Sequence, residues 1–261
     1  MSTERGTIRN ERFEVSLSAE DRTLTLCHRG GGALWRSDAP FLRFRKPAGA
    51  PDRDAPDWYW GKPDPVTLLP WTSDQLTIVE HERRIELVVS GIPAESATVR
   101  VALSIALEID RVVFSVDSVD GLAPGEELII DFPWRLGVAA AGTDGWLIIP
   151  RGAGVMADFD EERPGHVVEN FIYSGGQNGY SMPIFGVTRG GDALGAIIRT
   201  PHDCLLRAEL NAGDTAAYAA SPCWLFEGGR LMEPRRVDSV SYTHLTLPTN
   251  RRCRSRWSPY H

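Results

Sequence analysis

Residues 98–119 read TVRVALSIALEIDRVVFSVDSV, and this stretch decides the fold class. Apolar side chains alternate with small or polar ones from Val99 to Ile109, and a period of two predicts a β-strand. Asp110 then turns the chain into a second strand that ends near Val119. The two segments predict an antiparallel hairpin with one apolar face and one small or polar face.

Similar short segments lie on both sides of this hairpin, separated by turn residues. No segment of about ten residues shows a helical period. The fold class we predict is therefore all-β, and one large antiparallel β-sandwich suits a chain of this size. The further expected strands are 13–17, 23–26, 33–36, 75–80, 84–90, 127–134, 146–149, 155–157, 183–187, 194–198, 204–210, 215–220, 224–226 and 231–237.

Composition narrows the function classes. The 261 residues carry a net charge of -7, which argues against a nucleic-acid partner. No apolar run of about 18 residues predicts a membrane span, and the N-terminus lacks the apolar region of a secretory signal, so we expect a cytoplasmic protein. The four cysteines have no metal-type spacing and suit a reducing compartment. We expect no cofactor.

Residues 145–210 hold the loops in which a site would lie. Four carboxylates crowd residues 158–162, where they could supply some calcium ligands. The loop lacks the fixed glycine and the distal glutamate of a dedicated calcium loop, so we expect a solvated acidic turn and no metal. The glycine-rich loop 173–182 lacks the strand-to-helix context of a phosphate-binding loop, which excludes nucleotide binding.

Two segments could contact a carbohydrate. The aromatic cluster Trp58, Tyr59 and Trp60 lies in a Pro- and Asp-rich loop, and such rings can stack on sugar faces. The alternative is a loop that its aromatic side chains pin to the core. The glycine-rich loop could bring Gln177, Asn178 and Tyr180 to a polar ligand, or could simply turn. No residue forms a self-contained catalytic motif.

Two segments resemble a large bacterial family, DGWLIIPRGAGVMADF (144–159) and YSMPIFGVTRGGDALGAIIRTPHDCLLRAELNAGD (180–214). A third, PCWLFEGGRLMEPRRV (222–237), is similar to a connector seen in related carbohydrate-active proteins. In that family a galactose-mutarotase-like β-supersandwich precedes a (β/α)8 barrel related to glycoside hydrolases. The resemblance implies an antiparallel β-supersandwich with carbohydrate as the partner. The chain departs from the family at Arg151, where an aspartate is usual.

The C-terminal residues differ in character from the rest. The segment 240–249, VSYTHLTLPT, resembles a translated sequencing adapter, and residues 253–261, CRSRWSPYH, resemble the outer part of that adapter. We therefore expect a β-supersandwich domain over residues 1–238 and an adapter-derived, disordered tail over residues 239–261. The barrel that would carry the catalytic carboxylates is expected to be missing.

Three functions follow from these observations. The first is a non-catalytic N-terminal domain of a truncated glycoside hydrolase, itself inactive. The second is a carbohydrate-binding module with Trp58, Tyr59 and Trp60 as its platform. The third is a mutarotase-type sugar epimerase, which needs a histidine acid and a glutamate base, and His166 with Glu169 is the best pair for it.

Overall fold

The computed structural model describes residues 5–49, 64–95, 98–152, 154–174, 179–212, 216–230 and 233–242. Within these ranges the chain forms twenty strands and one short 3-10 helix, Ser73–Gln75. The strands lie in three antiparallel sheets, which confirms the all-β prediction.

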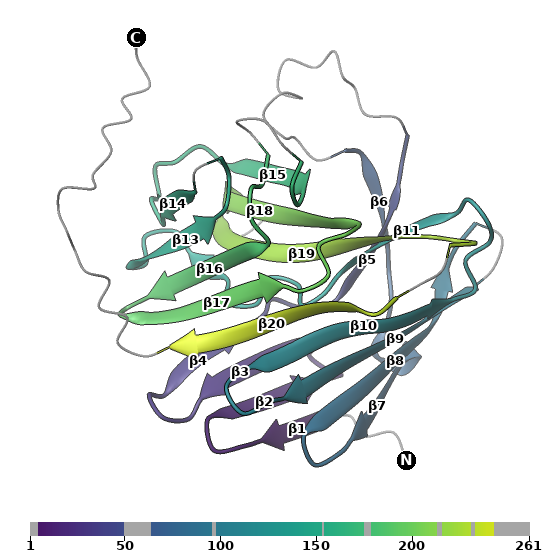
Figure 1. The fold of residues 1–261 in the computed structure, drawn as a ribbon, viewed down its shortest axis with the longest axis horizontal. Helices are drawn as coiled ribbons and strands as arrows, with labels where there is room; N and C mark the ends of the chain where they lie inside the picture. The colour runs from purple at the N-terminus through teal and green to yellow at the C-terminus, as the bar shows by residue number, and fades with distance from the viewer. Residues whose placement is uncertain are drawn as a thin grey trace, which may run out of the picture.

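One sheet is nine-stranded and forms a broad layer (Figure 1). In spatial order its strands are β14 (Val155–Asp158), β13 (Gly145–Ile149), β16 (Ile184–Arg189), β17 (Asp192–Ile198), β20 (Arg235–Tyr242), β10 (Val112–Asp120), β9 (Thr98–Leu107), β8 (Arg84–Pro93) and β7 (Leu76–Glu80). The hairpin predicted from residues 98–119 is confirmed as β9 and β10, where Val112 pairs with Leu107.

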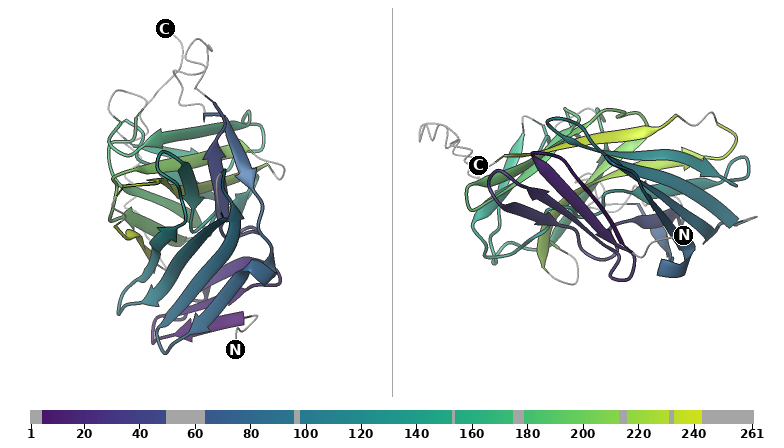
Figure 2. Two further views of the ribbon diagram at one scale, coloured as in Figure 1. Left: turned by 90° about the vertical axis from the view of Figure 1, so that its right-hand side faces the viewer. Right: turned by 90° about the horizontal axis from the view of Figure 1, so that it is seen from below.

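Two smaller sheets complete the sandwich (Figures 1 and 2). The seven-stranded sheet has the order β15 (His166–Phe171), β18 (Cys204–Ala212), β19 (Ala217–Glu227), β11 (Glu127–Asp131), β5 (Arg43–Pro47) and β6 (Val66–Leu69), with β12 (Ala139–Ala140) also paired to β19. The four-stranded sheet has the order β1 (Arg5–Arg9), β2 (Phe13–Ser18), β3 (Thr23–His28) and β4 (Ala33–Arg36).

The alternation of apolar and polar residues explains how the sheets pack. Every second side chain of a strand points to the same face, and these faces meet in a single hydrophobic core that draws on all three sheets. Strand β1 packs against β7 and β8, while β19 packs against β13 and β16. The side chains between these core residues point to the other face of each sheet.

Strand β20 runs past the domain boundary that we predicted at residue 238. Ser239 pairs with both Ala196 and Val112, and the indole Nε1 of Trp35 donates a 2.8 Å hydrogen bond to the Ser241 hydroxyl. Residues 239–242 are therefore part of the nine-stranded sheet. Residues 243–261 lie outside the described ranges.

Two further observations concern the helices and the cysteines. In the described part of the chain, no helix is long and apolar enough to span a membrane. The described cysteines Cys27, Cys204 and Cys223 are all free thiols.

Candidate functional site

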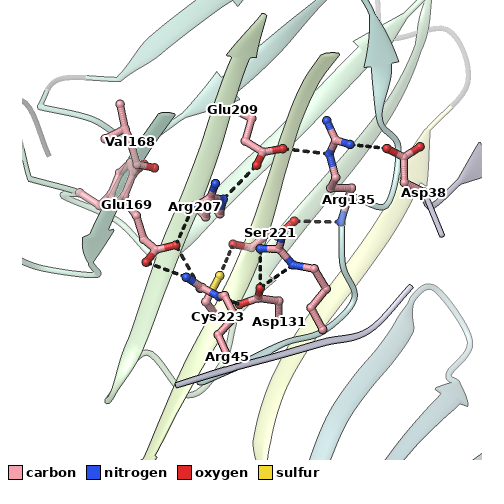
Figure 3. Close-up of polar contacts among 12 residues, drawn as sticks. Asp38, Arg45, Asp131, Arg135, Val168, Glu169, Arg207, Glu209, Ser221 and Cys223 are labelled. Carbon is pink, nitrogen blue, oxygen red and sulfur yellow. Dashed lines mark hydrogen bonds and ion pairs between the residues drawn. The ribbon is translucent and has the colours of Figure 1, made fainter. Parts of the chain in front are cut away.

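A row of charged side chains crosses the seven-stranded sheet on the face that points away from the core (Figure 3). The strand period places them there. On β18, Leu206 and Ala208 face the core, so Arg207 between them faces the other way. The same alternation brings out Glu169 from β15, Asp131 from β11 and Arg45 from β5.

Arg45 and Asp131 form the centre of this network. Arg45 Nη2 lies 2.7 Å from Asp131 Oδ1 and 3.0 Å from Glu169 Oε2. Arg43 adds a second guanidinium, since its Nη2 lies 2.8 Å from Asp131 Oδ2. Asp131 is fully buried and Arg45 is almost fully buried. An unpaired charge at such a site costs several kcal/mol, so the folded state requires the two side chains to be paired.

The network continues toward β4 through a second chain of pairs. Arg207 bridges Glu169, at 3.3 Å, and Glu209, at 2.9 Å. Glu209 is also 2.9 Å from Arg135, which pairs in turn with Asp38. The four arginines and four carboxylates of the network balance, so that it is formally neutral.

Trp134 lies among the guanidinium groups. The guanidinium carbon of Arg43 is 3.2 Å from the ring centroid, and those of Arg135 and Arg207 are 5.9 and 6.0 Å away. The backbone N–H of Arg135 donates to the Ser221 hydroxyl, which fixes this segment across β19. Cation–π contacts and the apolar ring thus add to the ionic pairs on this face.

The pairing keeps Asp131 ionised. Burial alone would raise the pKa of this carboxyl, but the charges of Arg45 and Arg43 outweigh burial and hold the pKa below its usual value. Burial raises the pKa of the neighbouring Cys223 thiol, and the Asp131 charge raises it further. Asp131 is therefore poorly suited to donate a proton near neutral pH, and Cys223 is poorly suited to act as a thiolate nucleophile.

The histidine–glutamate pair suggested by the sequence is not brought together as an acid and a base. His166 and Glu169 are three positions apart on β15, so their side chains point to opposite faces. The Glu169 carboxylate contacts Arg45 and Arg207 instead. No signal in the sequence indicated this network, because Arg45 and Glu169 lie in segments that were not expected to be strands.

Of the six residues predicted to contact sugar, the structure describes only Tyr180. Trp58, Tyr59, Trp60, Gln177 and Asn178 lie outside the described residues, so their roles stay predictions. Tyr180 is fully buried, and its hydroxyl donates to the Val168 carbonyl at 3.3 Å. Burial also raises the pKa of Tyr180. Its side chain lies in the core rather than at the surface of the loop.

The acidic turn at residues 158–162 is held by hydrogen bonds. Asp158 pairs with Arg163 at 2.6 Å, and Asp160 accepts a hydrogen bond from the backbone N–H of Glu162. Among the described residues, no group of three or more His, Cys, Asp or Glu side chains is placed to hold a metal ion.

A separate pocket of about 150 Å³ lies at the β5–β6 end of the sandwich. The Lys46–Glu95 ion pair, at 3.3 Å, is part of its lining. None of the residues that line this pocket belongs to the charge network.

Comparison with known proteins places the fold. No family model matches the chain, and no curated protein matches it. Among solved structures, the α-N-acetylgalactosaminidase NagBb from Bifidobacterium bifidum, in its complex with GalNAc, superposes with a TM-score of 0.62 at 15% identity over 91% of this chain. A protein of Escherichia coli K12 assigned as an aldose 1-epimerase superposes with a TM-score of 0.50 at 9% identity, over 92% of this chain and 99% of its own.

At these identities the similarity concerns the fold alone. The chain spans 36% of the length of the Bifidobacterium protein, whereas it matches nearly the whole of the Escherichia coli protein. The chain therefore has the antiparallel, galactose-mutarotase-like β-sandwich fold.

Proposed function

We propose that this chain is the non-catalytic β-sandwich domain of a glycoside hydrolase, and that it supports a (β/α)8 barrel which would carry the catalytic carboxylates. The observation that carries the proposal is the coverage of the match. The same sandwich accounts for 91% of this chain but only 36% of the α-N-acetylgalactosaminidase.

The charge network supports a structural role for the sheet face. Each of its carboxylates has an arginine partner, at 2.7 Å for Asp131, 3.0 Å for Glu169 and 2.9 Å for Glu209. A general acid needs a raised pKa and a general base needs a free lone pair directed at the substrate. Carboxylates whose oxygens are engaged by arginine meet the second requirement poorly, so they are better suited to fixing the strands of the sheet.

The free thiols support a place for the domain in a reducing compartment, and we propose the cytoplasm.

The decisive experiment is to sequence the source DNA past the codon of Val237. The proposal expects an open frame with alternating strand and helix patterns and at least one pair of acidic residues at strand ends. A continuation without that alternation would overturn it.

Activity assays on the chain itself supply a second test. We expect no release of nitrophenol from a panel of nitrophenyl glycosides, which includes the α-N-acetylgalactosaminide. We also expect no acceleration of galactose mutarotation, followed by polarimetry. A mutarotation rate that rises with protein concentration would instead favour the epimerase, the activity assigned to the Escherichia coli protein.

A further inference from the structure

The outer face at one end of the nine-stranded sheet carries an exposed tryptophan among aliphatic side chains. Strands β14, β13, β16 and β17 lie side by side there (Figure 1). Trp146 is 42% exposed, and the other large apolar side chains of this face are similarly open, with Met156 at 49%, Ile184 at 37% and Ile197 at 39%. We call these four residues the Trp146 face.

The middle of this face is flat. Gly186 of β16 pairs with Gly195 of β17. This glycine pair lies between the Thr188–Ala193 pair, which continues the row of Trp146, and the Ile184–Ile197 pair, so this part of the face has no side chains. The adjoining pair, Ile148 with Met156, borders the same strip on the other side. A flat strip beside an indole suits a ring-shaped ligand better than a helix, whose side chains need holes to fill.

Polar groups lie next to the indole. Trp146 pairs directly with Asp158 on β14 and with Thr188 on β16. Directly paired residues point to the same face with their Cβ atoms about 5 Å apart. Asp158 Oδ1 lies 2.6 Å from Arg163 Nη2, so a carboxylate and a guanidinium are offered together beside the ring.

The loop that carries this ion pair is fixed in place. The Asn211 amide donates to the carbonyls of Glu161 and Arg163, and the Tyr218 hydroxyl donates to the Asp160 carbonyl. Ligand binding would therefore not have to order this loop, and less affinity is lost to conformational entropy.

We propose that the Trp146 face binds a neutral pyranose. The apolar C–H groups of the sugar stack on the indole, while two neighbouring hydroxyls hydrogen-bond the Asp158 carboxylate and the Arg163 guanidinium. The two charges of the ion pair cancel, which favours a neutral sugar over an anionic one. This site stands apart from the proposed function, because a supporting domain does not need to bind sugar itself.

The test is a titration of the chain with methyl α- and β-pyranosides of glucose, galactose and N-acetylgalactosamine, followed by NMR chemical shifts. A single open platform predicts a weak complex, with a Kd on the order of 1 mM. We expect at least one pyranoside to bind, Trp146→Ala to weaken that binding at least tenfold, and Trp146→Phe to retain most of it.

Two variants separate the site from general effects. Asp158→Asn should weaken binding severalfold, because the ion pair loses its charge. Phe171→Ala serves as the matched control, since Phe171 is a strand aromatic of the seven-stranded sheet with 44% exposure, and it should leave binding unchanged. Circular dichroism should confirm that all four variants are folded.

Three results would overturn the proposal. The first is that no pyranoside in the panel shifts the spectrum. The second is binding that Trp146→Ala leaves intact. The third is a concentration-dependent dimer, seen by sedimentation, that Trp146→Ala dissociates while no sugar binds, because the face would then be an interface between two copies of the chain.

Discussion

Asp131 shows what a buried charge requires of its surroundings. Both carboxylate oxygens accept hydrogen bonds, Oδ1 from Arg45 and Oδ2 from Arg43, at 2.7 to 3.1 Å. Each acceptor is thus satisfied by charged donors, the strongest kind available in a protein. The stability of the sheet face depends on keeping these partners together, because removing one leaves the others buried without compensation.

Replacing Asp131 with asparagine should therefore be costly. The amide keeps the shape but removes the charge that Arg45 and Arg43 share, and we expect a loss of about 3 kcal/mol in the free energy of unfolding. Urea denaturation measures it. Asp120→Asn is the matched control, because Asp120 pairs with Arg100 at 3.5 Å on the exposed surface, and it should change stability by less than about 0.5 kcal/mol. Equal effects of the two variants would contradict a central role for Asp131.

The same residue should make stability depend on pH in acid. The pKa of Asp131 is lower in the folded protein than the unfolded value of 3.8, so its contribution is complete above that value and is lost as pH falls through the folded pKa. The gap in unfolding free energy between the wild type and Asp131→Asn should thus be constant from pH 7 to 5 and shrink below about pH 4. Urea midpoints of both proteins across this range would show it, and a gap that widens in acid would refute the assignment.

At the scale of elements, the period-two segments were predictable and the charged strands were not. The hairpin β9–β10 stands out because its apolar side chains alternate almost without interruption. Strand β5, RFRKP, has one apolar side chain between arginines, and β15, HVVENF, has no regular alternation, so neither was expected as a strand. Both supply arginine or glutamate to the charge network, whose partners come from distant parts of the chain.

The sequence predicted two segments, 215–220 and 224–226, where Pro222 lies between them. The structure has one continuous strand, Ala217–Glu227. On one side of β19, pairing with β11 ends at Cys223 and pairing with β12 begins at Tyr218. Pro222 falls in the gap between these partners, where neither strand pairs with it, which is why a proline is tolerated inside this strand.

A glycine at the start of β13 offers a test of how closely the strands approach. Gly145 has φ +155, and a Cβ atom there would lie 2.0 Å from the Thr188 carbonyl oxygen. Gly145→Ala should cost about 3 kcal/mol or more, because the backbones of β13 and β16 must separate. Gly190→Ala, in the β16–β17 turn at φ +56 with open space around it, should cost only about 1 kcal/mol. Thermal unfolding of both variants would decide, and a similar cost for the two would argue against the close approach.

At the scale of the whole molecule, the β-sandwich fold could be predicted from the sequence, but the charge network on the seven-stranded sheet could not. Alternation within a strand predicts which side chains share a face, and it therefore predicted the fold class from local pattern alone. Predicting the candidate site requires the order of the strands in the sheet, because Arg45 lies 124 positions from its partner Glu169 in the chain. The Trp146 face also needed strand order, because its residues come from two separate hairpins.

The extent of the domain gives the last prediction. Strand β20 pairs with β17 and β10, and its final residues add the Ser241 partner of the Trp35 indole, so the sheet needs the chain as far as Tyr242. If residues 243–261 are the disordered tail that the sequence predicts, a chain of residues 1–242 should melt within about 2 °C of the full chain. A chain of residues 1–238 loses four strand residues and leaves the buried Trp35 N–H unpaired, which costs about 2 kcal/mol or more. For a domain of this size the melting temperature should then fall by at least about 4 °C.

The variant Ser241→Ala in the 1–242 chain separates the indole hydrogen bond from the strand pairing. Equal melting temperatures for the 1–238 and 1–242 chains would show that residues 239–242 are dispensable, in agreement with the boundary predicted at residue 238.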